Sequence, residues 1–328
     1  MILESITESR ILVEAELEPM QGQRFQPTGF ADLGAATYTL PSGTRMLLVE
    51  SAQSMANRLE ATIVDADGEV IPELEGISYV TSTLTKPEGD TVVVSSMTEA
   101  HRLASPFIIS NKDFCNKFCE EAQYGEDARL NWKRINAALF KYDVNSLLHG
   151  VFLSLVKGGR IKSPRLLSSF IEASDVREVV SGGVKNTFDP KGSLAHEQCD
   201  KDVYANVPFQ RTEYTAGSIS IYFNLDVAGI RALGLSEDAQ NLLSCLALYK
   251  VRRILDGGLR LRTACDLKLK GEVKIAGMAN LPTQEQLLEE LRRSIVVCKP
   301  LFAEPAVTRL TDKLVKSKKK TANEDDED

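Results

Sequence analysis

The residues best suited to chemistry begin with a glycine-flanked loop at positions 21 to 30, Gln-Gly-Gln-Arg-Phe-Gln-Pro-Thr-Gly-Phe. Amide, guanidinium and hydroxyl groups stand there beside aromatic rings, on backbone that two glycines make flexible. Such donors suit a ligand that combines phosphates with bases. Arg24 and Gln26 are therefore candidate ligand contacts. Phe25 could stack on a base, but a core anchor is an equally good interpretation, and a capped surface loop is the ordinary alternative for the whole segment.

A second set of polar groups lies on a helix predicted within residues 48 to 60. Apolar residues recur there at spacings of three and four, which places them on one stripe. The opposite face is rich in uncharged hydrogen-bonding groups, whereas an ordinary solvated face carries more Lys and Glu. An ordinary surface helix remains the alternative. The candidate contacts on this face are Gln53, Ser54, Asn57 and Arg58.

Two basic stretches add candidates to a chain whose net charge of -7 argues against a generic nucleic-acid binder. Residues 157–185 hold six basic and three acidic residues, and residues 250–274 hold eight basic and three acidic residues. An acidic protein with two basic stretches can neutralise phosphates locally, although solvated loops and strand faces are the alternative. The candidates are Arg160, Lys162, Ser163 and Arg165 in the first stretch, and Arg260 and Arg262 in the second.

Three separated blocks carry a family resemblance. They are QGQRFQPTGFADLGAA at 21–36, LVESAQSMANRLE at 48–60 and GGRIKSPRLLSSFIEASDVREVVSGG at 158–183. In this order they closely resemble the backbone subunit of type I-U, also called type I-G, CRISPR surveillance complexes. That family is the Csb-one family, a branch of the Cas-seven group of RAMP proteins. The likeness runs from the N-terminal strand to roughly residue 300.

This resemblance implies a non-catalytic subunit that binds the guide RNA (crRNA). It also implies several copies arranged head to tail in a helical filament, with the inserted part of each reaching toward the next. Guide–target pairing would then supply sequence specificity, while the protein holds backbone and shape. The implied partners are crRNA, the target DNA strand, further copies of the chain, other subunits of the surveillance complex (Cascade) and a recruited helicase-nuclease. No cofactor is implied.

The order of predicted elements indicates the α+β class. Residues 9–19 alternate apolar and acidic residues, as a half-buried strand does. A strand, a helix and then further strands fit an RRM-like (ferredoxin-like) antiparallel sheet. The resemblance adds a hand-like architecture, with this sheet as the palm and a large inserted lobe. The predicted division is a palm from 1–110 and 209–312, an inserted lobe at 111–208 and a disordered charged tail at 313–328.

Motifs for catalysis or metal binding are weak or missing in the sequence. No G-x-x-x-x-G-K-[ST] occurs, and no histidine follows His196-Glu197 at the spacing of a metalloprotease. His149 lies in an apolar run, where a satisfied core histidine is favoured over a general base. Cys115 and Cys119 have no second pair near them, so buried thiols are favoured over zinc. No catalytic residue and no metal ligand is predicted.

Two alternative functions stay open. One is a guide-processing endoribonuclease of the same superfamily, which would use His149 or His196. The other is a protein scaffold that binds no nucleic acid.

Composition bounds the class of protein. With 43% apolar and 26% charged residues, the chain reads as an ordinary soluble globular protein. It has no run of eighteen apolar residues, so no membrane span is expected. The start, MILESITESR, lacks the basic and apolar regions of a signal peptide. Six irregularly spaced cysteines do not indicate a disulfide framework, and a cytoplasmic location is expected.

Overall fold

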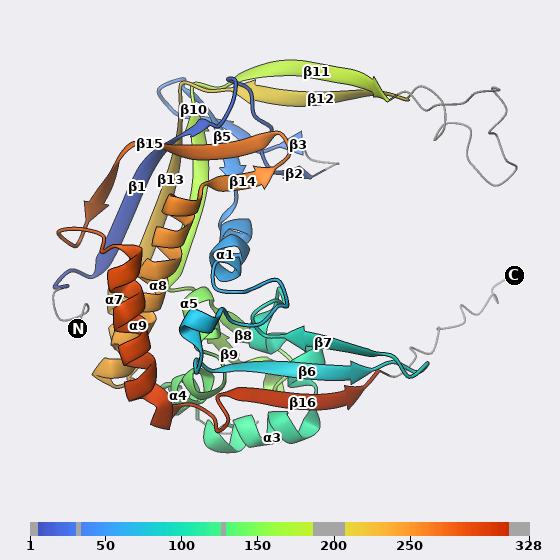
Figure 1. The fold of residues 1–328 in the computed structure, drawn as a ribbon, viewed down its shortest axis with the longest axis vertical. Coiled ribbons are helices and arrows are strands. Elements are labelled where there is room, and N and C mark those ends of the chain that lie inside the picture. The colour runs from blue at the N-terminus through green and yellow to red at the C-terminus, as the bar shows by residue number, and fades with distance from the viewer. Residues whose placement is uncertain (1–5, 31–33, 126–128, 186–206, 315–328) are drawn as a thin grey trace, which may run out of the picture.

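The computed structural model describes residues 6–30, 34–125, 129–185 and 207–314, and a seven-stranded sheet is its largest element (Figure 1). Neighbouring strands of this sheet run antiparallel throughout. The fold is therefore mixed α+β with an antiparallel sheet, as predicted. The strand order is β14 (Leu259–Arg262), β15 (Cys265–Ala276), β1 (Arg10–Pro19), β13 (Ser218–Asp226), β10 (Leu167–Ser174), β5 (Arg45–Glu50) and β4 (Thr37–Thr39).

The first strand shows why one face of the sheet is buried. Every second side chain of β1 points into the core, and the glutamates between them lie on the outer face. The alternation predicted for residues 9–19 is thus confirmed. On the outer face, lysines of β15 pair with these glutamates in register, at 3.3, 2.6 and 3.2 Å. The pairs are Lys274–Glu14, Lys270–Glu16 and Lys268–Glu18.

Helices cover the inner face of the sheet. α1 (Ala52–Ala61) packs on β10, α8 (Glu237–Gly257) packs on β13, and α9 (Gln284–Cys298) packs on α8. The short α7 (Val227–Ala232) contacts β1. Side-chain caps set where the long helices begin. The Ser236 hydroxyl accepts the N–H of Ala239 at 3.3 Å, and a capping box joins Thr283 to Gln286 at the start of α9.

A smaller, mostly helical part lies below the sheet in Figure 1. Aromatic packing joins its helices, because Phe114 of α3 meets Tyr142 of α4 edge to face at 5.1 Å between ring centroids. Its elements are α2 (Pro106–Ile109), α3 (Lys112–Glu121), α4 (Trp132–Tyr142), α5 (Val144–His149), β8 (Val151–Leu153) and β9 (Ile161–Ser163). None of the described helices is long and apolar enough to cross a membrane.

One boundary of the predicted inserted lobe needs correction. The lobe was predicted at 111–208, yet β10 within that range pairs with β13 on one side and with β5 on the other. Residues 167–174 therefore belong to the middle of the sheet. β10 is buried at every second residue, so one of its faces packs on the core, as in the other strands of the sheet. The rest of the division stays a prediction.

A second, three-stranded sheet lies apart from the first. β6 (Tyr79–Thr85) pairs with β7 (Thr91–Ser95) in antiparallel and with β16 (Val307–Lys313) in parallel. α2 packs on β6 and β7. Residues 79–95 thus meet the last described strand, β16, in one sheet. The predicted palm ranges included these segments, but they lie outside the seven-stranded sheet.

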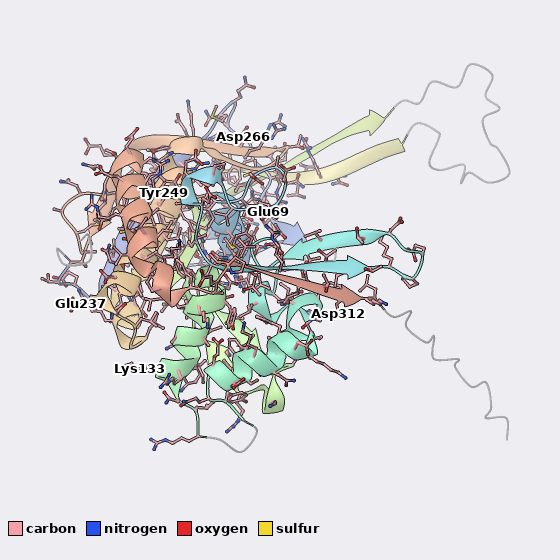
Figure 2. The ribbon with its side chains drawn as sticks, turned by 60° about the horizontal axis from the view of Figure 1, so that its bottom comes forward. Glu69, Lys133, Glu237, Tyr249, Asp266 and Asp312 are labelled. Carbon is pink, nitrogen blue, oxygen red and sulfur yellow. The ribbon has the colours of Figure 1, made fainter. Side chains whose placement is uncertain are left out.

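A long hairpin continues two strands of the main sheet. β11 (Arg177–Lys185) follows β10 after Asp175, whose φ is 48°, and β12 (Val207–Thr215) leads into β13. Figure 1 and Figure 2 show this hairpin and the β16–β6–β7 sheet extending to the same side of the molecule. A short hairpin, β2 (Gly29–Phe30) and β3 (Gly34–Ala35), lies near the base of β11. His196 and residues 315–328 of the predicted tail lie outside the described residues.

Candidate nucleic-acid interface

The glycine-flanked loop is hydrogen-bonded to three separate segments of the chain. Phe25 exchanges backbone hydrogen bonds with Tyr214 of β12, at 2.9 and 2.8 Å. The N–H of Gln26 donates to the carbonyl of Ala264 at 2.8 Å, and the N–H of Thr28 donates to Val49 at 2.9 Å. The loop therefore follows a fixed course between β12, the β14–β15 turn and β5. It presents Arg24, whose side chain is 57% exposed, to solvent.

The ring of Phe25 is not available for stacking. It is 1% exposed and belongs to the main hydrophobic core. Of the two interpretations that the sequence left open, the core anchor is correct. The reason is that the paired backbone of Phe25 and Tyr214 fixes the loop against β12 and turns this side chain inward.

α1 divides into two faces as predicted. Ser51 caps its start by accepting the N–H of Ser54 at 3.3 Å. Met55, Ala56 and Leu59 are buried, so the apolar stripe faces the core. Gln53 and Asn57 are exposed and lie one helical turn apart, which makes them neighbours on the outer face. Ser54 is half-buried beside them.

Arg58 has a structural role as well as being a candidate ligand contact. Its Nε–H donates to Glu50 at 3.4 Å, and its Nη2 donates to the carbonyl of Leu261 at 2.8 Å. A weaker bond of 3.4 Å reaches the carbonyl of Arg260. These contacts hold β14 against α1 and leave 28% of the Arg58 side chain exposed. Sequence reasoning did not indicate this structural role.

Glu50 is a residue that sequence reasoning missed. It is fully buried, and its carboxylate accepts both Arg58 and the hydroxyl of Thr28. Arg262 of β14 donates to that same hydroxyl at 2.7 Å. Candidates from the loop, from α1 and from β14 are therefore brought together around one buried charge. A single glutamate in a strand carries no signal for this, because its partners lie in three different segments.

The candidates of the basic stretch at 157–185 separate into exposed and buried members. Lys162 is exposed on β9, directly across from Phe152, which is 51% exposed. Arg160 lies with its guanidinium 5.6 Å from the ring centroid of Tyr124 and donates to the carbonyl of Gly125 at 3.1 Å. Ser163 is buried, with 5% exposure, because alternation along β9 turns it inward, so it is not a surface contact here.

Arg165 connects the end of the β9 segment to α1. Its Nη1 donates to the carbonyl of Ala52 at 2.9 Å, and its Nε donates to the carbonyl of His149 at 3.3 Å. Burial lowers the pKa of the guanidinium from its ordinary value, and the nearby Arg102 adds to this effect. Its main visible role is to fix β9 to the start of α1. We call the loop at 21–30, the exposed face of α1, β14 and β9 the candidate interface.

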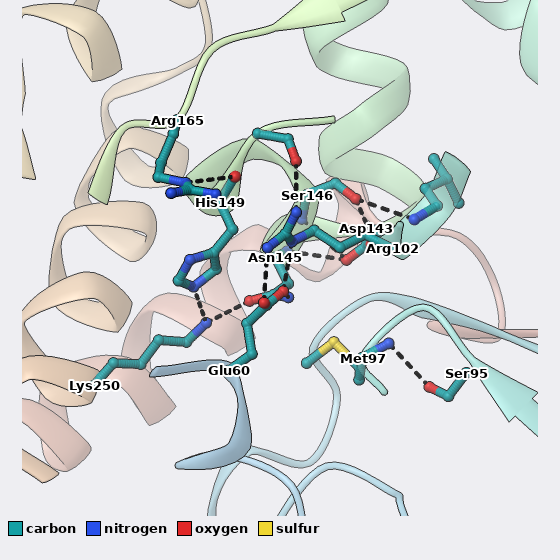
Figure 3. Close-up of polar contacts among 12 residues, drawn as sticks. Glu60, Ser95, Met97, Arg102, Asp143, Asn145, Ser146, His149, Arg165 and Lys250 are labelled. Atoms are coloured by element: carbon teal, nitrogen blue, oxygen red, sulfur yellow. Dashed lines mark hydrogen bonds and ion pairs between the residues drawn. The ribbon is translucent and has the colours of Figure 1, made fainter. Parts of the chain in front are cut away.

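A buried polar cluster lies beneath the inner side of α1 (Figure 3). Glu60 accepts two bonds from Arg102, at 2.6 and 2.8 Å, and one from the amide of Asn145 at 2.7 Å. Lys250 of α8 donates to Asn145, and its Nζ lies 2.9 Å from Nε2 of His149. The cluster joins α1, α5 and α8, and it is closed to solvent.

His149 is a core histidine, as the sequence favoured. It is 1% exposed, and its pKa lies well below the ordinary value because burial, and then the charge of Lys250, disfavour the imidazolium. Burial likewise lowers the pKa of Lys250 to about 7. Because His149 and Lys250 are closed to solvent, neither side chain can contact an RNA substrate in this conformation.

Arg211 and Glu213 of β12 are further residues that sequence reasoning missed. The carboxylate of Glu213, whose side chain is 5% exposed, lies 2.7 Å from Arg211 and 3.4 Å from Arg24. The three side chains line a hollow of about 610 Å³ beside the loop at 21–30. Arg24 and Glu213 are far apart in the sequence, so only folding brings this carboxylate between the two guanidiniums.

A family match decides which group of proteins the chain falls into. The model of the family described as CRISPR-associated protein GSU0053 matches residues 11–178, about half of the chain. This chain belongs to that CRISPR-associated family. The resemblance drawn from the three sequence blocks is confirmed at this level. The matched range contains the glycine-flanked loop, α1 and β9 of the candidate interface.

Solved structures show weaker likenesses. A chain from "CRISPR RNA-guided surveillance complex, pre-nicking" is 12% identical, with 74% of this chain and 69% of that chain covered and a TM-score of 0.37. The crystal structure of Thermofilum pendens Csc2 is 11% identical, with 89% of this chain and 76% of that chain covered and a TM-score of 0.32. No curated protein matches the chain.

Proposed function

We propose that this chain is a crRNA-binding backbone subunit of a type I CRISPR surveillance complex of the cytoplasm. Several copies would lie head to tail along one guide RNA and support its pairing with a target DNA strand. Further Cascade subunits and a recruited helicase-nuclease would complete the system. Membership of the GSU0053 family supports a CRISPR role. The three sequence blocks support the finer assignment to the Csb-one family.

The observation that carries the RNA-binding proposal is the polar strip of the candidate interface. Gln53 and Asn57 are exposed on α1, Arg24 is exposed on the adjoining loop, and Lys162 is exposed on β9. Arg165 joins β9 to α1, and Thr28 joins the loop to the end of β5. A strip of amides and separated cations suits contacts to phosphates and ribose hydroxyls, which hold an RNA without reading its sequence.

We also propose that the main sheet is the RRM-like palm. The four strands β15, β1, β13 and β10 stand side by side in that order. In the chain, α1 comes between β1 and β10, and α8 comes between β13 and β15. This connection and order correspond to the βαββαβ arrangement of ferredoxin-like folds. β5, β4 and β14 then extend the palm at its two edges.

The subunit itself is proposed to be non-catalytic. The endoribonuclease alternative needs a general base within reach of RNA, and the buried position of His149 weighs against that residue. The scaffold alternative, by contrast, gives the exposed amides of α1 no role. It predicts that the purified protein retains no RNA, whereas our proposal predicts that RNA is retained.

The test is purification after co-expression with the CRISPR array and the partner subunits, followed by sequencing of retained RNA. We expect protected repeat-spacer RNA of discrete length. Replacing both Gln53 and Asn57 with alanine should weaken RNA affinity about thirtyfold, because each amide contributes roughly 1 kcal/mol of hydrogen bonding and about 1.4 kcal/mol corresponds to a tenfold change. Lys133→Ala, an exposed cation on α4 away from the strip, is the control and should bind normally. Clean protein without RNA would overturn the proposal.

A further inference from the structure

A second hollow, of about 460 Å³, lies at the base of the β11–β12 hairpin. The loop at 21–30, the β2–β3 hairpin, β11, β12 and β14 contribute its walls. Among the described lining residues, Arg211 and Arg262 are the cations and Glu178 is the carboxylate. Glu178 lies 3.5 Å from Arg45, so its charge is partly balanced from outside the hollow. The lining residues themselves thus carry two positive charges and one negative charge.

Both guanidiniums are held in place by neighbours. Nη2 of Arg211 lies 2.7 Å from the nearly buried carboxylate of Glu213, and Nη2 of Arg262 donates to the Thr28 hydroxyl at 2.7 Å. A free arginine loses side-chain entropy when it is immobilised. Here that ordering precedes any ligand. Glu213 and Thr28 thus act as positioning residues for two cations from different strands.

The hydrogen bonding of both guanidiniums is incomplete within the described part of the protein. The Nε–H groups of Arg211 and Arg262 are shielded from solvent, and neither has a partner there. A buried donor without a partner lowers the stability of the folded protein. Each guanidinium therefore keeps a donor that the described residues do not satisfy.

The other lining groups indicate what kind of acceptor fits. Gln26, Gln210 and Thr212 add amides and a hydroxyl, and Gly29 and Gly34 leave backbone uncovered. Arginine forks bind phosphate oxygens in two places at once, and amides and hydroxyls bond to phosphate and sugar. The set therefore matches a phosphodiester better than a carboxylate metabolite or a cation.

We infer, building on the proposed RNA-binding role, that Arg211 and Arg262 together form a site for one phosphodiester of the bound RNA at the base of the β11–β12 hairpin. Glu213 orients Arg211 and Thr28 orients Arg262 for this contact. The site lies next to the loop at 21–30, so RNA that follows the candidate interface reaches it from the side of Arg24. Arg211 comes from outside the three sequence blocks that carry the family resemblance.

The salt dependence of RNA affinity tests this site. For single-stranded nucleic acid, each phosphate contact contributes about 0.7 to the slope of log K against log salt. We expect Arg211→Ala and Arg262→Ala each to lower the slope by about 0.7, and the double variant to lower it no further, because both cations share one phosphate. The matched control is Arg177→Ala on β11, whose side chain leaves the opposite strand face from Glu178. The shared site would be overturned if the slopes of the Arg211 and Arg262 variants equal that of Arg177→Ala. It would also be overturned if the slope of the double variant falls by about 1.4.

A second arm separates this site from the RNA-binding proposal as a whole. Inorganic phosphate alone should raise the melting temperature of the wild-type protein, and the double variant should lose that shift. A wild type that binds RNA while its variants match Arg177→Ala overturns only the site. A wild type that binds no RNA overturns the proposed function, and a surviving phosphate shift would then leave an anion site without RNA. A wild type that shows neither overturns both.

The variants must be shown to fold, because Glu213 is nearly buried and loses its ion pair with Arg211 in Arg211→Ala. Arg262→Gln keeps a donor for Thr28 and removes the charge, so it serves as the second variant. Its far-ultraviolet circular dichroism and melting temperature should match those of Arg177→Ala. A lowered salt slope in that well-folded variant supports the site, and an unchanged slope overturns it.

Discussion

The buried carboxylate of Glu50 accepts the Nε–H of Arg58 at 3.4 Å and thereby joins the end of β5 to α1. The Thr28 hydroxyl donates to the same carboxylate, which adds the glycine-flanked loop. Arg58 in turn reaches the carbonyl of Leu261 in β14. Three segments of the candidate interface thus meet at one charge that does not face solvent.

Glu50→Ala should lower the free energy of unfolding by about 1–3 kcal/mol, because Arg58 and Thr28 lose a buried acceptor. Urea denaturation measures the change. The matched control is Glu289→Ala, which removes an ion pair to Arg293 with side chains 77% and 62% exposed. That control should cost less than about 1 kcal/mol. Equal losses in the two variants would contradict the role given to Glu50.

Phe25→Leu should leave RNA affinity nearly unchanged, because the ring lies in the core and faces no ligand. Phe25→Ala should instead lower the free energy of unfolding by about 3–5 kcal/mol through the cavity it creates. Filter binding and urea denaturation measure the two effects. A stacking ring would cost about 1–3 kcal/mol of RNA binding in the leucine variant. Such a loss in a stable Phe25→Leu protein would restore the stacking interpretation.

Stability should rise between pH 7 and pH 8 because of Lys250. Its pKa is about 7 in the folded protein and 10.5 for an ordinary lysine, so the unfolded chain binds more protons in this range. The free energy of unfolding therefore increases with pH, by at most about 1.4 kcal/mol per pH unit for one group. As pH falls toward 7, the stabilisation is lost.

Lys250→Met isolates this contribution. Burial raises the pKa of Asp143 to about 6, and the pKa of His149 lies below its ordinary 6.5, so neither group accounts for a rise above pH 7. Cysteines in the unfolded chain titrate near 9.0 and are shared by both proteins. The difference in unfolding free energy between wild type and variant should thus grow in favour of the wild type as the pH rises. A constant difference from pH 7 to pH 8 would contradict the lowered pKa.

Gly277→Ala should be strongly destabilising. Its φ is +89°, and an added Cβ would lie 2.0 Å from the carbonyl oxygen of Arg10 at the start of β1. Gly271→Ala is the matched control, since its φ is +77° but no atom lies within 4 Å of the added Cβ. The control should cost about 1–2 kcal/mol from backbone strain alone. Thermal unfolding should show a clearly larger loss for Gly277→Ala, and equal losses would mean that β1 moves aside freely.

Local patterns in the sequence were sufficient for several elements. The alternation in β1 and the apolar stripe of α1 depend on neighbours within a few residues. Both predictions are confirmed in the structure. The three sequence blocks also identified the CRISPR family, because a family match needs residue order and not contacts.

The burial and the contacts of individual site residues could not be predicted from such local patterns. Ser163 and Arg58 were predicted as ligand contacts from residue type and spacing, and Phe25 was left open between stacking and a core anchor. Folding buries Phe25 and Ser163 and gives Arg58 a structural role. The deciding partners of Phe25 and Arg58 are Tyr214 and Leu261, which lie far away in the sequence, and local periodicity contains no information about such partners.

The sequence by itself thus determined the family, the α+β class and the exposed polar face of α1. Only the tertiary structure decided which cations stand together. Arg24 and Arg211 meet at Glu213, and Arg262 meets the loop at Thr28. The physical reason is that β12 leads into β13, and that β13, β1 and β15 pair antiparallel, so residues far apart in the chain become neighbours at one end of the sheet.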